Sequence, residues 1–180
     1  MTTDGGRPIE RAQAGDRAAF ESLLLPLLGP AYRLALGILL RPAEAEDAVQ
    51  DAAFRAWRKI GNVRPDADFR PWFLAVVANE SRRLRRLRWW SITLTPQLDW
   101  NQEPPAGVDS IDIARAFAHL KIADRQILVL RYYANLSIEE TASALGLTSK
   151  AAKSKIHRAL RKLRPYFASD ETAGSFDTHE

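Results

Sequence analysis

The chain has 180 residues, of which 46% are hydrophobic and 27% are charged, a composition that indicates a globular rather than a disordered protein. No cysteine is present, which excludes disulfides, thiolate zinc sites and a cysteine nucleophile. The formal net charge of +4 and the pI of about 9.6 indicate a polyanionic partner. Because we find neither an apolar run of bilayer length nor a signal-peptide core, we expect a cytoplasmic protein with no membrane insertion.

Helical periodicity dominates the sequence and no alternating strand pattern is found, which predicts an all-α fold. The first expected helix begins after Asp16. Pro26 and Gly29 should bend or interrupt it, and Pro30 is placed at the first residue of the continuation, where proline is tolerated. The next helix is expected to open at Pro42. Its expected buried stripe consists of Val49, Ala53, Ala56, Trp57 and Ile60.

A longer helix is expected to start at Asp68 and to end in a stretch with five arginines in seven residues. Its inward-facing residues are expected to be Phe69, Phe73, Val76, Val77, Leu84 and Leu87. At 3.6 residues per turn, one polar face should carry Asn79, Arg82, Arg83 and Arg86. An amide beside forked guanidinium groups suits phosphates and unstacked bases. The alternative is an arginine face that is only solvated.

The character of the sequence changes after residue 90. Residues 91–110 contain no lysine or arginine, but they contain prolines and acids such as Asp99 and Glu103, which is typical of a linker. We therefore expect a flexible acidic linker, although Trp89, Trp90 and Trp100 suggest that part of it packs on a domain. An acidic tail is expected over residues 169–180.

A second helical unit is expected over residues 111–168. Its first inward-facing stripe should consist of Ile113, Phe117 and Leu120. Asp124 is expected to cap the next helix. The expected organisation is thus two small helical domains, over residues 1–90 and 111–168, joined by the linker over residues 91–110.

A helix-turn-helix is predicted within the second unit. Ser137 and Glu140 match the S-x-x-E capping box that starts a helix, and Gly146 lies where the chain must turn sharply. Thr148 and Ser149 can cap the next helix. That helix carries seven basic residues and no acid over residues 149–164. In a helix-turn-helix, such a second helix lies in the DNA major groove. A basic helix that is only solvated is the alternative.

Three stretches in this order resemble the extracytoplasmic-function (ECF) type of bacterial RNA polymerase sigma factor. Residues 43–60 are similar to the helix that docks on the polymerase clamp, residues 69–86 to the promoter-melting helix, and residues 123–164 to the helix-turn-helix that recognises the minus-thirty-five element. The likeness covers roughly residues 8–167. It implies transcription initiation at promoters, with core RNA polymerase and promoter DNA as partners, the DNA being duplex at minus-thirty-five and single-stranded at minus-ten. An anti-sigma factor is a further partner that the resemblance suggests.

The resemblance also implies roles for individual residues. In this family the loop before the arginine-rich helix holds a flipped minus-ten base, and that loop spans residues 61–68 here. The residues expected to contact DNA are Asn62, Asn79, Arg82, Arg83, Arg86, Ser149, Lys150, Lys153, Ser154, His157 and Arg158. The residues expected to contact polymerase are Glu46, Asp47, Gln50 and Asp51. The chain departs from the family pattern at Ala151, Ala152 and Leu160, which affects the minus-thirty-five sequence that it would recognise. The stretch over residues 23–32 is more apolar than the family pattern and suggests a partner surface.

Two other classes of protein were weighed. A conventional helix-turn-helix regulator would not explain the arginine–asparagine helix or the acidic linker. A helical adaptor that binds only protein would leave both basic faces solvated. We expect no enzyme, because the three histidines are scattered and neither a phosphate-binding glycine loop nor a paired-carboxylate motif is found. No catalytic residue, metal site or cofactor is therefore expected.

Overall fold

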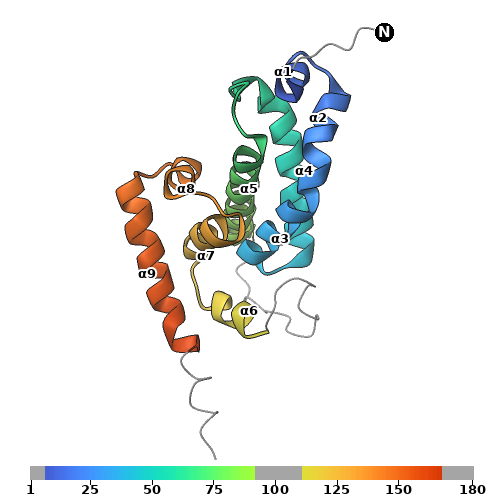
Figure 1. The fold of residues 1–180 in the computed structure, drawn as a ribbon. Helices are drawn as coiled ribbons and strands as arrows, with labels where there is room; N and C mark the ends of the chain where they lie inside the picture. Colours follow the sequence, from blue (N-terminus) through green and yellow to red (C-terminus); the bar gives the residue numbers. More distant parts are fainter. Residues whose placement is uncertain (1–6, 92–110, 168–180) are drawn as a thin grey trace, which may run out of the picture.

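The computed structural model describes residues 7–91, here called the N-terminal half, and residues 111–167, the C-terminal half (Figure 1). The N-terminal half contains α1 (Pro8–Gln13), α2 (Arg17–Leu24), η1 (Leu25–Leu27), α3 (Leu28–Leu39), α4 (Pro42–Lys59), η2 (Ile60–Asn62) and α5 (Phe69–Ser91). The C-terminal half contains α6 (Ile111–Ala118), α7 (Ile122–Leu128), the π-helical turn η3 (Val129–Tyr133), α8 (Ile138–Leu145) and α9 (Ser149–Phe167). Within these ranges every regular element is a helix, which confirms the predicted all-α fold.

Local signals set most helix starts in the N-terminal half. The Asp16 carboxylate accepts the Ala19 amide (3.0 Å) and caps α2, and Pro42 is the first residue of α4, as predicted. The expected position of Pro30 is wrong by two residues, because α3 already begins at Leu28. The third residue of a helix has no amide partner within the helix, so proline costs little there.

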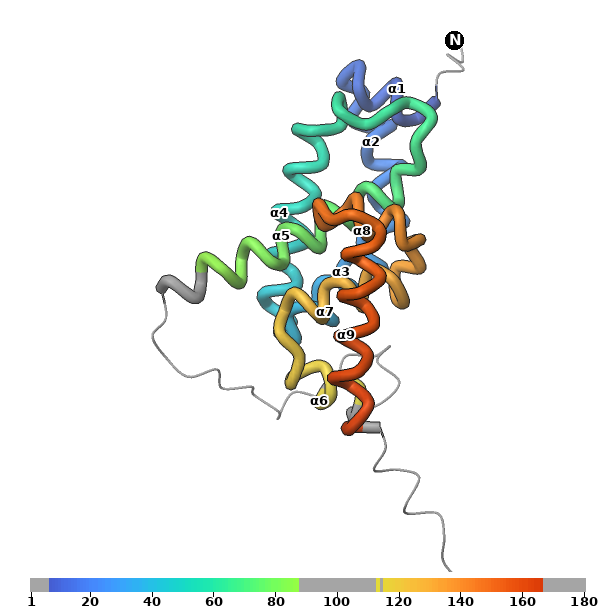
Figure 2. The backbone as a smooth tube through the Cα atoms, turned by 90° about the vertical axis from the view of Figure 1, so that its left-hand side faces the viewer, coloured from blue at the N-terminus to red at the C-terminus, as the bar shows by residue number. Residues whose placement is uncertain are grey.

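The buried face of α4 differs from the expected stripe. Ala53 and Trp57 are only half-buried. The buried residues of the helix are Glu44, Ala45, Ala48, Val49, Ala52 and Ala56. This alanine-rich face lets α3 and α5 approach α4 closely. On α5, Leu87 was expected to face inward but is 51% exposed, because this end of the helix extends beyond the core (Figure 2).

The stretch Arg17–Leu39 is long and apolar enough to cross a membrane by length and composition alone, contrary to the expectation that no run reaches that length. In the structure, η1 interrupts this stretch, and Leu34 and Ile38 of α3 are fully buried in the core. The α3 part of the stretch is thus a core helix, whereas Leu25 in η1 is exposed.

The predicted helix-turn-helix is present in the C-terminal half. Ser137 and Glu140 form both hydrogen bonds of a capping box, Gly146 ends α8 in a left-handed conformation (φ 64°), and the Thr148 hydroxyl accepts the Ala151 amide (3.2 Å). The expected cap at Asp124 is wrong. The N-cap of α7 is Lys121, and the Asp124 carboxylate instead accepts a hydrogen bond from the Lys162 ammonium (2.6 Å), which ties α7 to α9.

The two halves pack against each other through α7, η3 and α8, which lie on α3 and α5 (Figure 1). Val129, Leu130 and Leu136 belong to the C-terminal half but are buried in the core of the N-terminal half. Gly37 permits this packing, because a Cβ atom there would lie 3.2 Å from a methyl group of Val129. The sequence did not predict this docked arrangement.

Candidate nucleic-acid and polymerase interfaces

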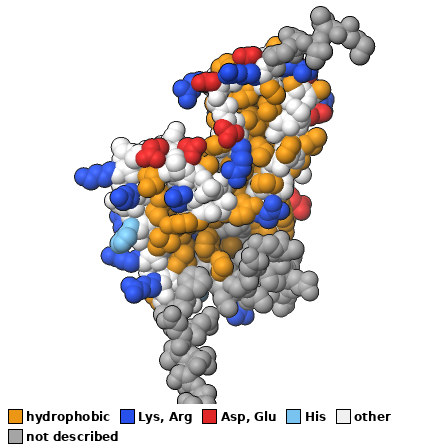
Figure 3. Space-filling model, in the orientation of Figure 1, with side chains coloured by type: hydrophobic (Ala, Val, Ile, Leu, Met, Phe, Trp, Pro, Cys, Tyr) orange, Lys and Arg blue, Asp and Glu red, His pale blue; other side chains and the backbone are white. Residues whose placement is uncertain are grey.

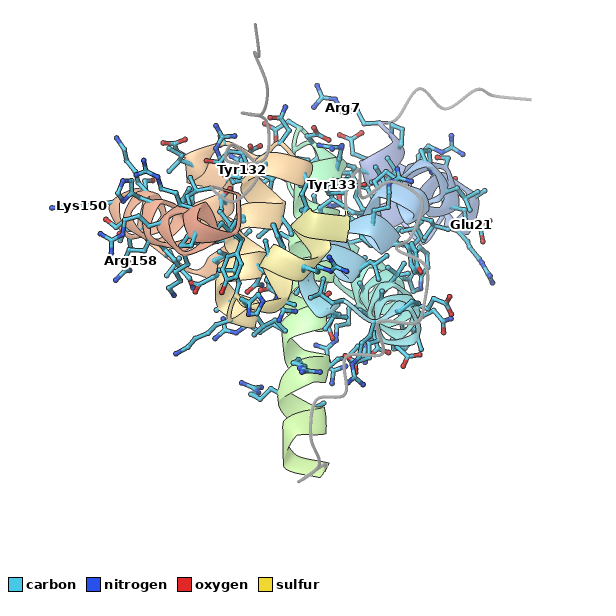
Figure 4. The ribbon with its side chains drawn as sticks, turned by 90° about the horizontal axis from the view of Figure 1, so that it is seen from below. Arg7, Glu21, Tyr132, Tyr133, Lys150 and Arg158 are labelled. Atoms are coloured by element: carbon cyan, nitrogen blue, oxygen red, sulfur yellow. The ribbon has the colours of Figure 1, made fainter. Side chains whose placement is uncertain are left out.

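The open face of α9 is formed as the sequence predicts. Ala152, Ile156, Ala159 and Leu163 bury the inner face. The six side chains expected to contact the upstream duplex, which are Ser149, Lys150, Lys153, Ser154, His157 and Arg158, are all exposed. Figure 4 shows Lys150 and Arg158 directed away from the rest of the molecule, and Figure 3 shows basic side chains and a histidine along this edge. Among the described residues, none of these six is paired with a carboxylate, so the face keeps its positive charge.

Lys155 on the inner edge of α9 lies within electrostatic reach of Arg82 in α5. Lys155 is half-buried, and burial is the main cause that lowers its pKa; the positive charges of Arg82, Arg158 and Lys162 lower it further, while Asp124 acts in the opposite direction. Arg82 belongs to α5, so in the docked arrangement one positive charge of α5 acts unfavourably on a lysine of α9.

Asn79 was expected to contact the separated DNA strand, and the structure places it against the C-terminal half. Its amide donates to the Ala144 carbonyl of α8 (3.0 Å), and its side-chain oxygen accepts from Gln126 of α7 (3.4 Å). Gln126, which is almost fully buried, also donates to the Ala78 carbonyl (3.0 Å). Of the other expected strand contacts on α5, Arg82 and Arg86 are exposed.

Arg83 lies in an ion-pair network that joins α4 and α5. Its Nε donates to Glu80 (2.6 Å), and its Nη2 donates to Asp51 (2.7 Å). Glu80 also pairs with Arg55 (2.9 Å). The hydrogen bond to Glu80 is the main cause that raises the pKa of Arg83. The structure therefore brings together one residue expected to bind DNA, Arg83, and one expected to bind polymerase, Asp51. We call these four residues the α4–α5 ion-pair network.

The face of α4 expected to contact polymerase contains an aromatic residue that the sequence analysis missed. Glu46, Asp47 and Gln50 are exposed, and one turn further Phe54 is 63% exposed with the Arg58 guanidinium 5.8 Å from its ring centroid. An open pocket of about 470 Å³ adjoins this ring. The pocket is lined by Asp51, Phe54, Arg55, Arg58, Lys59 and Arg83. Helical spacing could have revealed Phe54, because a residue four positions after Gln50 lies on the same face of the helix.

Asn62, the residue expected to meet the flipped base, is exposed at the end of η2. A residue that was not expected from the sequence braces this loop. The Gln13 side chain in α1 donates to the carbonyls of Ile60 (3.0 Å) and Val63 (2.6 Å), one on each side of Asn62. At a rise of 1.5 Å per residue, the expected strand contacts on α5, from Asn79 to Arg86, span about 10 Å. Asn62 lies on the loop before this helix, so the expected minus-ten contacts come from two separate parts of the chain.

The chain matches two family models, one for Sigma-70 region 2 over residues 23–91 and one for Sigma-70, region 4 over residues 110–163. It is 31% identical to the ECF RNA polymerase sigma factor SigL of Mycobacterium tuberculosis over 87% of this chain and 93% of SigL. This chain belongs to the ECF RNA polymerase sigma factors. The RNA polymerase sigma factor NccH of Alcaligenes xylosoxydans xylosoxydans is 28% identical, over 89% of this chain and 93% of NccH.

Two solved structures resemble this sigma factor in fold. CnrH in complex with the cytosolic domain of CnrY matches with a TM-score of 0.68 and 25% identity, over 93% of this chain and 99% of CnrH. The sigma factor RpoE in complex with the anti-sigma factor NepR from Bartonella quintana matches with a TM-score of 0.71 and 23% identity, over 84% and 98% of the two chains. The function of this protein is that of an RNA polymerase sigma factor, which directs transcription initiation at promoters. Within the described residues, no group of three or more metal-binding side chains is found.

Proposed function

We propose that this sigma factor contacts a promoter at two separate places. The open face of α9 recognises the minus-thirty-five duplex, and Asn62 together with the polar face of α5 holds the single-stranded minus-ten element. The observation that carries this proposal is the exposed basic face of α9. It projects from a capped helix-turn-helix, and no carboxylate of the described residues pairs with it. Asn79, Arg82, Arg83 and Arg86 supply the strand contacts of α5.

The two halves must separate for both contacts to form at once. The two elements are about 25 base pairs apart, which is about 85 Å along the duplex. In the docked arrangement, Arg82 of α5 is near enough to Lys155 of α9 to affect its pKa. Residues 91–110 would span up to about 65 Å if extended, which would allow the halves to move apart. The proposed domains are therefore residues 1–90 and 111–168, with the linker over residues 91–110 and a tail over residues 169–180.

Polymerase binding is assigned to the exposed face of α4. Glu46, Asp47, Gln50 and Asp51 supply its polar part, and exposed Phe54 supplies an apolar anchor one turn further. Buried aromatic anchors dominate the binding energy of many interfaces, so Phe54 is expected to contribute strongly. On this assignment the sigma factor carries no catalytic residue, and core polymerase performs the chemistry in the cytoplasm.

An inhibitory protein is a further proposed partner. The structure of CnrH was solved with the cytosolic domain of CnrY bound, and CnrH is similar to this chain over nearly its whole length. Exposed large apolar side chains could serve such a partner. Leu25 is 62% exposed in the apolar stretch over residues 23–32, and Tyr132 and Tyr133 are exposed in η3. Figure 4 shows both tyrosines at the surface between the two halves.

The test is transcription in vitro with purified core polymerase and a promoter library. We expect initiation only when the sigma factor is added, and the enriched promoters should share two elements at a fixed spacing. A conventional regulator would instead bind promoter duplex tightly by itself and never support initiation. That outcome would refute the proposal.

A further inference from the structure

The α4–α5 ion-pair network links two surfaces that are proposed to bind different partners. Asp51 belongs to the polymerase face of α4, and Arg83 belongs to the DNA face of α5. In the structure these two side chains bind each other, with 2.7 Å between Arg83 Nη2 and the Asp51 carboxylate. Neither can be fully available to its own partner while this ion pair persists.

The two carboxylates that hold Arg83 differ in their environment. The Glu80 side chain is only 6% exposed and pairs with both Arg83 and Arg55, so it stays bound whatever happens at the surface. The Asp51 side chain is 46% exposed. Exposed ion pairs contribute little to stability, so a competing ion can replace Asp51 at low cost. Loss of one partner from a buried pair is far more costly, which keeps Glu80 in place.

We propose that the Asp51–Arg83 ion pair couples polymerase docking to the capture of single-stranded DNA. A lysine or arginine of polymerase that pairs with Asp51 releases the Nη2 edge of Arg83, which then binds a phosphate of the minus-ten strand. Glu80 is the positioning residue, because it holds the other edge of the Arg83 guanidinium and keeps the released edge at the surface. This inference rests on the proposed function and adds a mechanism by which its two binding events favour each other.

The charges around the network support this exchange. Arg55, Arg58 and Lys59 line the same pocket as Arg83, and Asp51 is the one carboxylate among the pocket-lining residues. Neutralising Asp51 with a partner cation therefore makes the pocket more positive beside Arg83. By thermodynamic linkage, DNA bound at Arg83 must strengthen polymerase binding at Asp51 by the same factor.

The test compares Asp51→Ala with Asp47→Ala. Both substitutions remove one negative charge from the exposed side of α4, but only Asp51 contacts Arg83. The affinity for a single-stranded minus-ten oligonucleotide is measured for the free sigma factor and for the holoenzyme. We expect Asp51→Ala to raise the affinity of the free protein severalfold more than Asp47→Ala does. The enhancement of DNA affinity by core polymerase should fall by at least about fivefold for Asp51→Ala only.

Glu80→Gln tests the positioning role. It should lower the oligonucleotide affinity of the holoenzyme and reduce the enhancement by core, while promoter binding through the minus-thirty-five element stays unchanged. A merely structural role would lower both kinds of DNA binding together. Equal effects of Asp51→Ala and Asp47→Ala on the enhancement would overturn the coupling, yet the proposed function would stand if the wild-type holoenzyme still initiates transcription. Failure of the wild-type protein to initiate with any core polymerase would refute the proposed function itself.

Discussion

The two basic surfaces of this sigma factor differ in how available they are. On α9, all six side chains expected to contact duplex DNA are exposed, with no ion pair to any carboxylate of the described residues. On α5, Asn79 is bonded to α8, and Arg83 is bonded to Glu80 and Asp51. The proposed duplex-binding surface on α9 is thus exposed in the docked arrangement, whereas two of the four expected strand-binding residues of α5 are bonded within the protein. Availability, rather than charge alone, distinguishes the two surfaces.

The largest expected effect comes from breaking the contact between the halves. Leu130 is fully buried in the core of the N-terminal half, so Leu130→Ala should lower the free energy of unfolding by about 2–5 kcal/mol. It should also separate the halves and free the Asn79 amide from the Ala144 carbonyl. Small-angle X-ray scattering should show a larger radius of gyration, and the affinity of the free protein for single-stranded DNA should rise.

Ile127→Ala is the matched control for that substitution. Ile127 lies three residues earlier and is also fully buried, but it belongs to the core of the C-terminal half. It should cost a similar amount of stability without increasing the radius of gyration of the folded protein. If Leu130→Ala leaves the protein as compact as Ile127→Ala does, η3 does not hold the halves together.

The second largest effect is expected on the open face of α9. Arg158→Ala should weaken recognition of the upstream element by about 1–3 kcal/mol if the guanidinium contacts a base edge. Binding to a set of upstream-element variants measures this change. Arg164→Ala removes the same charge from an exposed site nearer the end of α9 and should preserve the sequence preference. An equal loss on all sequences with Arg158→Ala would identify a phosphate contact instead.

A smaller effect is expected at Asn79, where substitution tests whether the side chain serves docking of the two halves, DNA binding or both. Asn79→Ala removes a hydrogen bond to α8 and should weaken docking by about 0.5–1.5 kcal/mol. In the holoenzyme it should also lower the affinity for the minus-ten strand. Gln126→Ala removes two hydrogen bonds to α5, one to the Ala78 carbonyl and one to the Asn79 side chain, but keeps Asn79 itself. Because Gln126 is assigned no DNA contact, this variant should weaken docking only. If both variants bind the strand equally well in the holoenzyme, Asn79 serves docking alone.

The smallest effect tests the half-buried charge of Lys155 in α9. Burial and neighbouring cations lower the pKa of Lys155 from its ordinary value of 10.5, so its charged form is disfavoured in the folded state. Lys155→Gln should therefore slightly raise the unfolding temperature at neutral pH. The gain should shrink as the pH rises through the lowered pKa towards 10.5, because the wild-type lysine then loses its proton in the folded state. A gain in unfolding temperature that does not depend on pH would contradict this explanation. Lys153→Gln is the control at an exposed site and should change the unfolding temperature little.

Much of the fold could be predicted because its signals are local. The cap at Asp16, the helix start at Pro42 and the capping box at Ser137 depend on residues within one turn, and the structure confirms each of them. The open face of α9 followed from helical periodicity for the same reason. Asp124 has the chemistry of a cap, but its partner is Lys162, which lies 38 residues further along the chain. The sequence alone contains no signal for such a distant pairing.

The candidate site on α5 was harder to predict, because some of its side chains pair with residues that are distant in the sequence. Residue types and helical spacing correctly placed Arg82 and Arg86 on an exposed face. Asn79 and Arg83 fulfil the same pattern, yet their partners Ala144 and Asp51 lie 65 and 32 residues away. Composition indicates what a side chain can bind, whereas tertiary packing decides what it already binds.

The two hydrogen bonds from Gln13 have a practical consequence for dividing this protein into parts. The Sigma-70 region 2 match begins only at residue 23, so a fragment or a chimaera cut at that boundary would lack α1 and Gln13. The carbonyls of Ile60 and Val63 would then lose their brace, although every residue of the matched segment would remain. On the proposed assignment of the minus-ten base to this loop, transplanting that specificity into another sigma factor requires α1 as well as the loop itself.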